Sequence, residues 1–255
     1  MVHQYFDPAN SETFNALATK TDNKYDLYYF GLFGISGTVR TILAVSDANF
    51  TSNNPPGDTW KTQYKPRTTF GVMPVLRETF ADGSLTFLIS ETDAIERYLS
   101  RKFGYFGKTA LEDVIISQFQ SSTNSLIQKL VYRYLILDKD PELRAANKEK
   151  LLGGPIIDWI CIHEKHLSEN PVAVAAKEEH GNGHYVGDSI SLADLKTVQL
   201  IDMIRALSDK LISKDKTPAL WKVKENIETT PSVLEWKATE DYQKLAETNL
   251  SLLGY

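Results

Sequence analysis

The residues with the clearest capacity for chemistry lie where predicted elements begin or end. An aromatic run, Asp26–Phe30, has strand character and leads into a loop punctuated by glycines, Gly31–Gly37. Tyr29 lies near the end of this run and Ser36 lies inside the loop. Each carries a hydroxyl group that can donate a hydrogen bond. A ligand bound at the end of the predicted strand could therefore meet either hydroxyl.

A second boundary lies at Glu91 and Thr92. Ser90 and Asp93 have the spacing of a capping box, and Ile95, Tyr98 and Leu99 follow at helical spacing. The free N–H groups at the start of a helix, together with a hydroxyl, form a site for an anion. The pattern therefore predicts a helix whose first turn could bind a carboxylate.

Metal and thiol chemistry are disfavoured by the remaining reactive residues. His163 and His166 lack the spacing of a zinc-protease helix, and His180 and His184 have no third ligand near them. We therefore expect no metal site. Cys161, the only cysteine, stands among apolar residues and is predicted to lie in the core rather than to act as a nucleophile.

Composition narrows the class of protein further. The chain has 255 residues, 42% of them apolar, and a net charge of −5. Such a chain can form one large domain or two small ones, and its acidic balance argues against nucleic-acid binding. The N-terminus lacks the features of a signal peptide, and no apolar run is long enough for a membrane span. A single cysteine fits a reducing compartment, so we expect a cytoplasmic protein without a membrane partner.

The order of predicted elements divides the chain in two. Strands and helices alternate up to about residue 105, including a hairpin with its turn at Asp82–Gly83. Strand signals then vanish, and helices are predicted over 111–137, 141–168, 191–213, 217–228 and around 240–249, with a surface loop at 170–184. We predict an N-terminal extension (1–23), a mixed α/β domain (24–105) and an all-helical domain (106–255).

These elements and their motifs resemble the cytosolic glutathione transferase family over roughly residues 24–250. The resemblance implies a thioredoxin-like N-terminal domain that binds glutathione, followed by an all-helical C-terminal domain. Among the classes that use a tyrosine, the sequence is most similar to the sigma class. Four local matches, in their order along the chain, carry the resemblance.

The first match is Tyr29 with Arg40. In the tyrosine-type classes, the catalytic tyrosine ends a strand and an arginine follows eleven residues later, as it does here. Ser36 competes for the role because it stands four residues before Arg40, which is the spacing of the serine-type classes. The resemblance favours Tyr29 as the catalytic residue and leaves Ser36 as the alternative.

The second and third matches imply the glutathione-binding residues. Met73 would offer its backbone to the cysteinyl part of glutathione, with a cis peptide bond before Pro74. Glu91 would bind the ammonium of the γ-glutamyl residue, and Thr92 with the helix start would bind its carboxylate. The sigma-like pattern also implies contacts from two more residues to the glycine carboxylate of glutathione. These are Trp60, which is offset by one position, and Lys65.

The fourth match is the segment Tyr185–Asp194 in the helical half. It resembles the family signature in which a glycine precedes Ser/Thr-x-Ala-Asp. Ser191 and Asp194 have the spacing of a capping box, with Ile190 and Leu195 placed as a hydrophobic staple. This segment is expected to help the domain fold and to take no part in the chemistry.

Two positions depart from the family pattern. Phe33 stands where many tyrosine-type members carry an arginine, four residues after the tyrosine. The stretch Ser117–Gln120 lacks the acid that the partner subunit commonly contributes. Both departures point to altered activation of the thiol.

The resemblance implies a glutathione transferase of the detoxification type. Glutathione would be its co-substrate, and the enzyme would activate the thiol for attack on an apolar electrophile. Leu32, Phe33, Tyr132 and Tyr134 would line the electrophile wall, and the protein would form a homodimer. A non-catalytic protein of the same fold, used for ligand binding or interaction, and a glutathione-dependent isomerase or peroxidase remain as alternatives.

Overall fold

The computed structural model describes residues 11–131 and 140–253, and the chain divides into two compact units. The first unit comprises 1–103 together with 235–248, and the second comprises 104–234 together with 249–255. A segment near the C-terminus thus groups with the N-terminal part of the chain. The boundary between folding domains at residues 105 and 106 stays a prediction, because the compact units do not show which parts fold independently.

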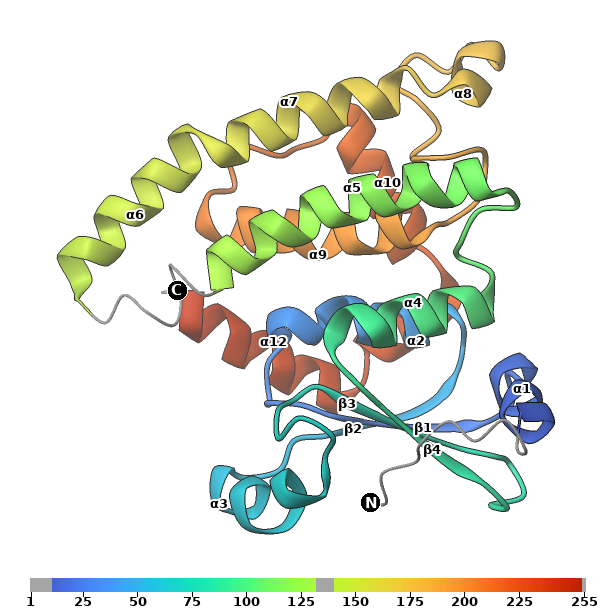
Figure 1. Ribbon diagram of the computed structural model, residues 1–255. Coiled ribbons are helices and arrows are strands. Elements are labelled where there is room, and N and C mark those ends of the chain that lie inside the picture. The colour runs from blue at the N-terminus through green and yellow to red at the C-terminus, as the bar shows by residue number, and fades with distance from the viewer. Residues whose placement is uncertain (1–10, 132–139, 254–255) are drawn as a thin grey trace. The chain divides into compact units, whose positions relative to one another are not determined.

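The first unit is built on a four-stranded sheet with the strand order β2-β1-β3-β4 (Figure 1). The strands are β1 (Lys24–Tyr28), β2 (Asn49–Asn53), β3 (Val75–Thr79) and β4 (Thr86–Ser90). The pair β1/β2 is parallel, whereas β1/β3 and β3/β4 are antiparallel. Tyr25 and Leu27 of β1 are completely buried, which explains why an aromatic and apolar run forms a central strand.

Two helices cover one face of this sheet, α2 (Gly37–Val45) and α4 (Thr92–Phe103) (Figure 1). Val39, Ile42 and Leu43 of α2 are fully buried, as their helical spacing predicts. A parallel β-α-β unit followed by a β-hairpin and a helix is the thioredoxin-like arrangement. The predicted fold of the N-terminal domain is therefore confirmed.

The predicted N-terminal extension contains a helix, α1 (Ser11–Thr19), which the polar sequence did not reveal. Its connection to β1 is tied to the sheet through Asn23, which is fully buried. The Asn23 side chain donates a hydrogen bond of 2.7 Å to Glu78 Oε1. The connection between α1 and β1 is therefore part of the fold of the first unit.

Glu78 is the centre of a buried polar cluster in β3. Lys102 Nζ lies 2.6 Å from Glu78 Oε1, and Tyr98 donates a hydrogen bond of 2.6 Å to Glu78 Oε2. Both side chains of the Glu78–Lys102 pair are fully buried. Burial raises the pKa of Tyr98 and lowers the pKa of Lys102. Because a buried charge is costly without partners, this cluster holds the end of α4 against the sheet.

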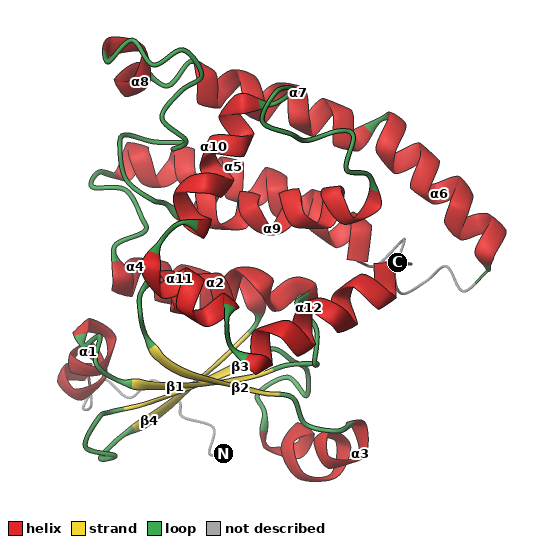
Figure 2. Ribbon diagram, turned by 180° about the vertical axis from the view of Figure 1, so that it is seen from behind, coloured by secondary structure: helices red, strands yellow, loops and turns green. Residues whose placement is uncertain are grey.

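The second unit is helical in its described residues, which confirms the predicted class (Figure 2). It contains α5 (Ala110–Gln128), α6 (Pro141–Gly153), α7 (Pro155–Ser168), α8 (Pro171–Ala175), α9 (Leu192–Leu207) and α10 (Pro218–Glu228). Most of α9 is buried, and it packs against α5 and α10. Among the described helices, none is long and apolar enough to cross a bilayer.

The predicted capping box at the start of α9 is confirmed. The Asp194 N–H donates to Ser191 Oγ, and the Ser191 N–H donates to Asp194 Oδ2 at 2.6 Å. Asp194 is fully buried and also accepts a hydrogen bond from the Tyr185 N–H. The carboxylate therefore joins the preceding loop to the central helix of this unit.

Three features of the chain's second half differ from the sequence prediction. The helix predicted over 141–168 is two helices, because Gly153, Gly154 and Pro155 interrupt it. A short helix, α8, lies inside the segment predicted to be a loop. Cys161 is exposed, not buried. The buried face of α7 instead carries Trp159, Ile160 and His163, so helical phase places Cys161 on the outer side.

The C-terminal part of the chain forms two more helices, α11 (Pro231–Lys237) and α12 (Glu240–Leu253). The boundary between the two units falls within α11, after Leu234. Leu245 of α12 is almost completely buried. The segment 235–248 thus contributes to the core of the first unit.

Candidate functional site

The register of the sheet brings three candidate residues to one end of it. Val75 of β3 is paired with Tyr28 of β1 on one side and with Ser90 of β4 on the other. Three candidate residues lie one position beyond this row: Tyr29, Pro74 and Glu91. Because neighbouring strands lie about 4.8 Å apart, these residues form a continuous edge.

Tyr29 is held just beyond the end of β1 and is 5% exposed. Its N–H donates a hydrogen bond of 3.1 Å to the carbonyl of Asn53 at the end of β2. Its hydroxyl oxygen accepts a hydrogen bond of 3.3 Å from the Ile35 N–H. The accepted bond polarises the phenol, which makes its O–H a better donor to an anion.

Gly34 brings the loop backbone up to this hydroxyl. It has φ of +46°, and a Cβ atom there would lie 2.7 Å from the Tyr29 hydroxyl oxygen. A side chain at position 34 would thus be strained and would also collide with the phenol. The glycine of the loop is therefore needed for the close approach of the backbone to Tyr29.

Arg40 of α2 holds the same loop in place and is fully buried. Its guanidinium donates hydrogen bonds to the carbonyl oxygens of Phe30 and Leu32 and to Ser52 Oγ. The guanidinium carbon also lies 5.7 Å from the centre of the Tyr29 ring. Burial lowers the pKa of Arg40 to about 10. In the sequence, only the spacing of Arg40 from Tyr29 was informative. In the structure, Arg40 supports the loop through its hydrogen bonds.

The segment that enters β3 supplies the next part of the edge. The peptide bond between Met73 and Pro74 is cis, as the resemblance implied. The stem of Lys65 lies beside this segment, since a Cβ atom at Gly71 would be 3.3 Å from Lys65 Cε. Lys65 itself is exposed at its end. The structure thus brings Lys65 next to the chain that leads to Met73 and Pro74.

Glu91 and Thr92 complete the edge at the start of α4. Glu91 is exposed and has φ of +75°, a left-handed conformation that costs a residue other than glycine about 1–3 kcal/mol. Ser90 is still the last residue of β4, so Glu91 is the residue directly before the helix. Such strain is typical of positions whose side chain must point in one direction for function.

Two further candidates, Trp60 and Ser36, are not part of this row. Trp60 is 9% exposed and opens a π-helical turn, Trp60–Tyr64, after the short helix α3 (Gly57–Thr59). Within the described part of the chain, its indole N–H has no hydrogen-bond partner. Ser36, the alternative to Tyr29, is fully buried, and its hydroxyl has no partner among the described residues.

The wall predicted for an electrophile is described only in part. Tyr132 and Tyr134 lie outside the described residues. Phe33, also predicted for this wall, contacts two aromatic residues from the C-terminal part of the chain. Its ring centre lies 5.4 Å from that of Tyr242 and 6.4 Å from that of Trp236. No sequence pattern indicated these long-range contacts.

Comparisons with known proteins find similarity to one family of enzymes. The family model described as "Glutathione S-transferase, C-terminal domain" matches residues 128–240. The chain is 27% identical over 219 residues to probable glutathione S-transferase 7 of Caenorhabditis elegans, covering 84% of this chain and 96% of that protein. The pi-class glutathione S-transferase structure of Onchocerca volvulus has a TM-score of 0.69 and 25% identity. That likeness covers 87% of this chain and 95% of the other.

The chain is thus similar to glutathione transferases over most of its length. The sigma-class transferase structure of Fasciola hepatica shares the fold, with a TM-score of 0.68 and 22% identity over 85% of this chain and 95% of that one. Similar structures therefore come from both the pi and the sigma classes. The similarity to glutathione transferases supports the predicted family, and the sigma-like assignment remains a prediction.

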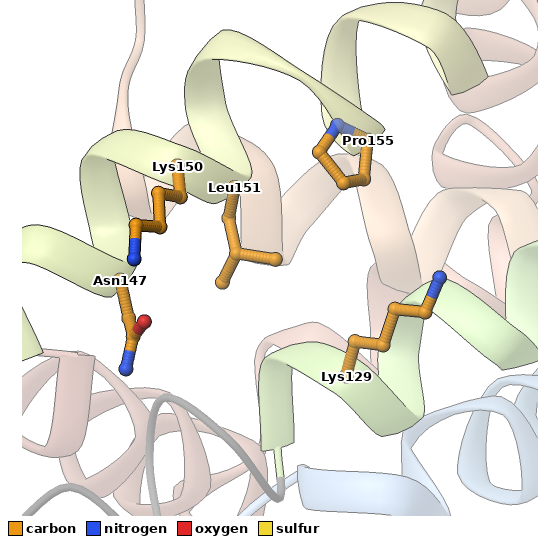
Figure 3. Close-up of a pocket in the computed structure, with 5 residues that line it drawn as sticks. All are labelled: Lys129, Asn147, Lys150, Leu151 and Pro155. Carbon is orange, nitrogen blue, oxygen red and sulfur yellow. The ribbon is translucent and has the colours of Figure 1, made fainter.

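A separate cavity of about 250 Å³ lies in the second unit (Figure 3). Its lining residues are Lys129, Asn147, Lys150, Leu151 and Pro155. The cavity contains none of the residues predicted to bind glutathione. Within residues 11–131 and 140–253, no group of three or more His, Cys, Asp or Glu side chains could hold a metal ion.

Proposed function

We propose that the protein is a glutathione transferase that activates the thiol of glutathione for attack on apolar electrophiles. The observation that carries this proposal is the row formed by Tyr29, the cis Met73–Pro74 bond and Glu91 at one end of the sheet. This row supplies a hydroxyl, a backbone edge and a carboxylate side by side. The similarity to glutathione transferases supports glutathione as the co-substrate.

The proposed binding mode uses the polar groups of the edge. The backbone of Met73 binds the cysteinyl part of glutathione as an added strand would, and Glu91 pairs with the γ-glutamyl ammonium. The N-terminal N–H groups of α4, with the Thr92 hydroxyl, bind the γ-glutamyl carboxylate. Lys65 and Trp60 bind the glycine carboxylate. Glutathione then lies along the edge with its sulfur directed to Tyr29.

In the proposed reaction, Tyr29 acts as a neutral donor. A free thiol has a pKa of about 8.5, so only a few per cent is thiolate at pH 7. A hydrogen bond from the Tyr29 hydroxyl to the thiolate, worth about 1.5–3 kcal/mol, lowers that pKa by about one to two units. About a quarter to three quarters of the bound glutathione is then thiolate at pH 7. The thiol proton passes to water, and the thiolate sulfur bonds to the electrophilic carbon while the leaving group departs with its electron pair. No side chain needs to act as a general base.

Tyr29 is the better candidate of the two hydroxyl residues. Its ring stands at the row that also contains Pro74, and its hydroxyl is aligned by the Ile35 N–H. The hydroxyl of Ser36 is fully enclosed by protein. For a bound thiol to reach Ser36, the loop would have to open, which favours Tyr29.

We further propose that the protein is a homodimer. Large apolar side chains are exposed in both units: Phe70 is 62% and Val72 is 45% exposed in the first, and Leu111 is 70% and Ile162 is 61% exposed in the second. Contiguous exposed apolar side chains are typical of surfaces that associate, and Phe70 and Val72 stand only two positions apart in the sequence. Sedimentation should give twice the chain mass of 28.7 kDa, and a Phe70→Asp variant should sediment as a monomer.

We extend the proposal to detoxification of electrophiles in the cytoplasm. The cytoplasmic location is supported by the single cysteine, which allows no intrachain disulfide.

Three assays on one preparation test the proposed function. Chlorodinitrobenzene measures transfer, a hydroperoxide measures peroxidase activity, and a glutathione column measures binding. A transferase binds the column and turns over chlorodinitrobenzene. Column retention without turnover in either assay would support a binding protein instead, and turnover of the hydroperoxide alone would support a peroxidase. Absence of both retention and turnover would contradict the proposal entirely.

A further inference from the structure

Two residues near the C-terminus pack against the loop that follows Tyr29. Phe33, Phe50, Trp236 and Tyr242, here termed the aromatic cluster, join the loop, the strand β2 and the C-terminal segment. The ring centres of Trp236 and Tyr242 are 4.8 Å apart, and that of Trp236 lies 6.2 Å from that of Phe50. All four residues belong to the first compact unit. The cluster is thus a feature of the unit that contains the sheet edge.

Phe33 occupies a sensitive position within the loop. The next residue, Gly34, brings its backbone against the Tyr29 hydroxyl, and the one after it, Ile35, donates its N–H to that hydroxyl. A turn closed by the hydrogen bond from the Ser36 N–H to the Phe33 carbonyl, 2.9 Å long, joins these residues. A shift of Phe33 therefore moves the groups that align the phenol.

The loop is held at two places, in the residues before this turn and at the first residue of the turn. Arg40 holds the carbonyl oxygens of Phe30 and Leu32. Phe33 is held by its ring contacts to Trp236 and Tyr242. Hydrogen bonds fix the first anchor in direction, whereas the second depends on ring packing from a segment that is distant in the sequence.

We propose that Trp236 and Tyr242 are positioning residues for thiol activation, acting on Tyr29 through Phe33. This inference rests on the proposed function, because it concerns the hydroxyl that would stabilise the thiolate. Neither residue needs to touch glutathione in this role. Their rings keep Phe33, and with it the backbone of Gly34 and Ile35, in the arrangement that presents the phenol O–H.

The test is the pKa of the thiol in the complex of protein and glutathione without an electrophile, read from the ultraviolet absorbance of the thiolate. Trp236→Ala and Tyr242→Ala should each raise this pKa by up to about 1 unit, because a displaced Phe33 leaves the hydrogen bond from Tyr29 to the thiolate partly misaligned. Tyr242→Phe keeps the ring and should leave the pKa unchanged. Trp221→Ala is the matched control, because Trp221 lies in α10 and packs on Arg205 of the second unit.

A double-mutant cycle tests whether the effect passes through Phe33. If it does, Phe33→Leu raises the thiol pKa by itself, and Trp236→Ala adds little in the Phe33→Leu background. Fully additive shifts would overturn the proposed route. If Trp236→Ala fails to fold, Trp236→Leu replaces it in the same cycle.

Other outcomes separate this inference from the proposed function. An unchanged thiol pKa in both alanine variants, with only the KM for the electrophile altered, would overturn the positioning role and make the two residues part of the electrophile wall. If the wild-type complex itself shows no lowering of the thiol pKa relative to free glutathione, thiol activation fails, and the positioning role fails with it. A lowered wild-type pKa with unshifted variants rejects the positioning role alone.

Discussion

The guanidinium of Arg40 donates a hydrogen bond of 3.0 Å to the carbonyl oxygen of Leu32. This bond connects a fully buried cation in α2 to the loop that carries Phe33 and Gly34. Because the Gly34 backbone contacts the Tyr29 hydroxyl, the bond links the helix to the residue proposed to activate the thiol. The support of the phenol thus comes from buried polar contacts of the first unit.

Replacing Arg40 by methionine should therefore lower both stability and thiol activation. The variant leaves the carbonyl oxygens of Phe30 and Leu32 without their donors, which should reduce the free energy of unfolding by about 2–4 kcal/mol. Arg40→Lys retains a cation but cannot reach all of its acceptors at once, so we expect an intermediate effect. Urea unfolding measures the stability. A variant as stable as the wild type would show that the buried bonds do not support the loop.

The choice between Tyr29 and Ser36 has a direct test. Tyr29→Phe keeps the ring and removes only the hydroxyl, so the kinetic thiol pKa should rise by about one to two units. Turnover at pH 7 should then fall roughly tenfold to a hundredfold. Ser36→Ala should change the pH–rate profile little. The reverse pair of results would transfer the catalytic role to Ser36, and an unshifted profile for Tyr29→Phe would remove it from Tyr29.

Replacing Glu91 by glycine should increase the stability of the protein and weaken its binding of glutathione. Its left-handed conformation is strained for glutamate and relaxed for glycine, so Glu91→Gly should raise the free energy of unfolding by about 1 kcal/mol. Both Glu91→Gly and Glu91→Gln should weaken glutathione binding about tenfold, because each removes the partner of the γ-glutamyl ammonium.

The glutamine variant is the matched control for Glu91, since it keeps the backbone strain and removes only the charge. Calorimetric titration with glutathione and thermal unfolding would be measured on both variants. Glutathione binding at wild-type affinity in Glu91→Gln would contradict the ion pair. A glycine variant that is less stable than the wild type would contradict the strain.

Buried His163 should make the stability of the protein depend on pH. Burial lowers the pKa of His163 to about 3, whereas an exposed histidine has a pKa near 6.5. Its Nδ1 lies 2.5 Å from the Tyr185 hydroxyl, and its Nε2 lies 3.2 Å from Ser122 Oγ. The folded state therefore binds fewer protons than the unfolded state between these two pKa values.

Because of this difference, the contribution of His163 to the free energy of unfolding is complete above about pH 6.5 and is lost as the pH falls toward 3. Urea unfolding at a series of pH values measures the slope. His163→Gln should flatten the slope in this window, while His180→Gln, at an exposed position, should leave it unchanged. Equal slopes in the wild type and in His163→Gln would assign the acid sensitivity to other groups.

Local patterns in the sequence predicted much of the fold. The capping box of Ser191 and Asp194, the hairpin turn at Asp82–Gly83 and the buried face of α2 each depend on residues a few positions apart. The same holds for the helix start after Glu91, whereas the cis Met73–Pro74 bond was implied by the family resemblance and not by local spacing. Interactions of such short range are determined by residue type and spacing, so they were readable before the structure.

Tertiary structure decided which side chains support the site and which face solvent. The partners of Phe33 are Trp236 and Tyr242, far along the chain, and no local rule links them. Cys161 has apolar neighbours in sequence yet is exposed, because the phase of α7 buries Trp159 and His163 instead. Burial depends on what packs against an element, and that packing arises only when distant segments come together.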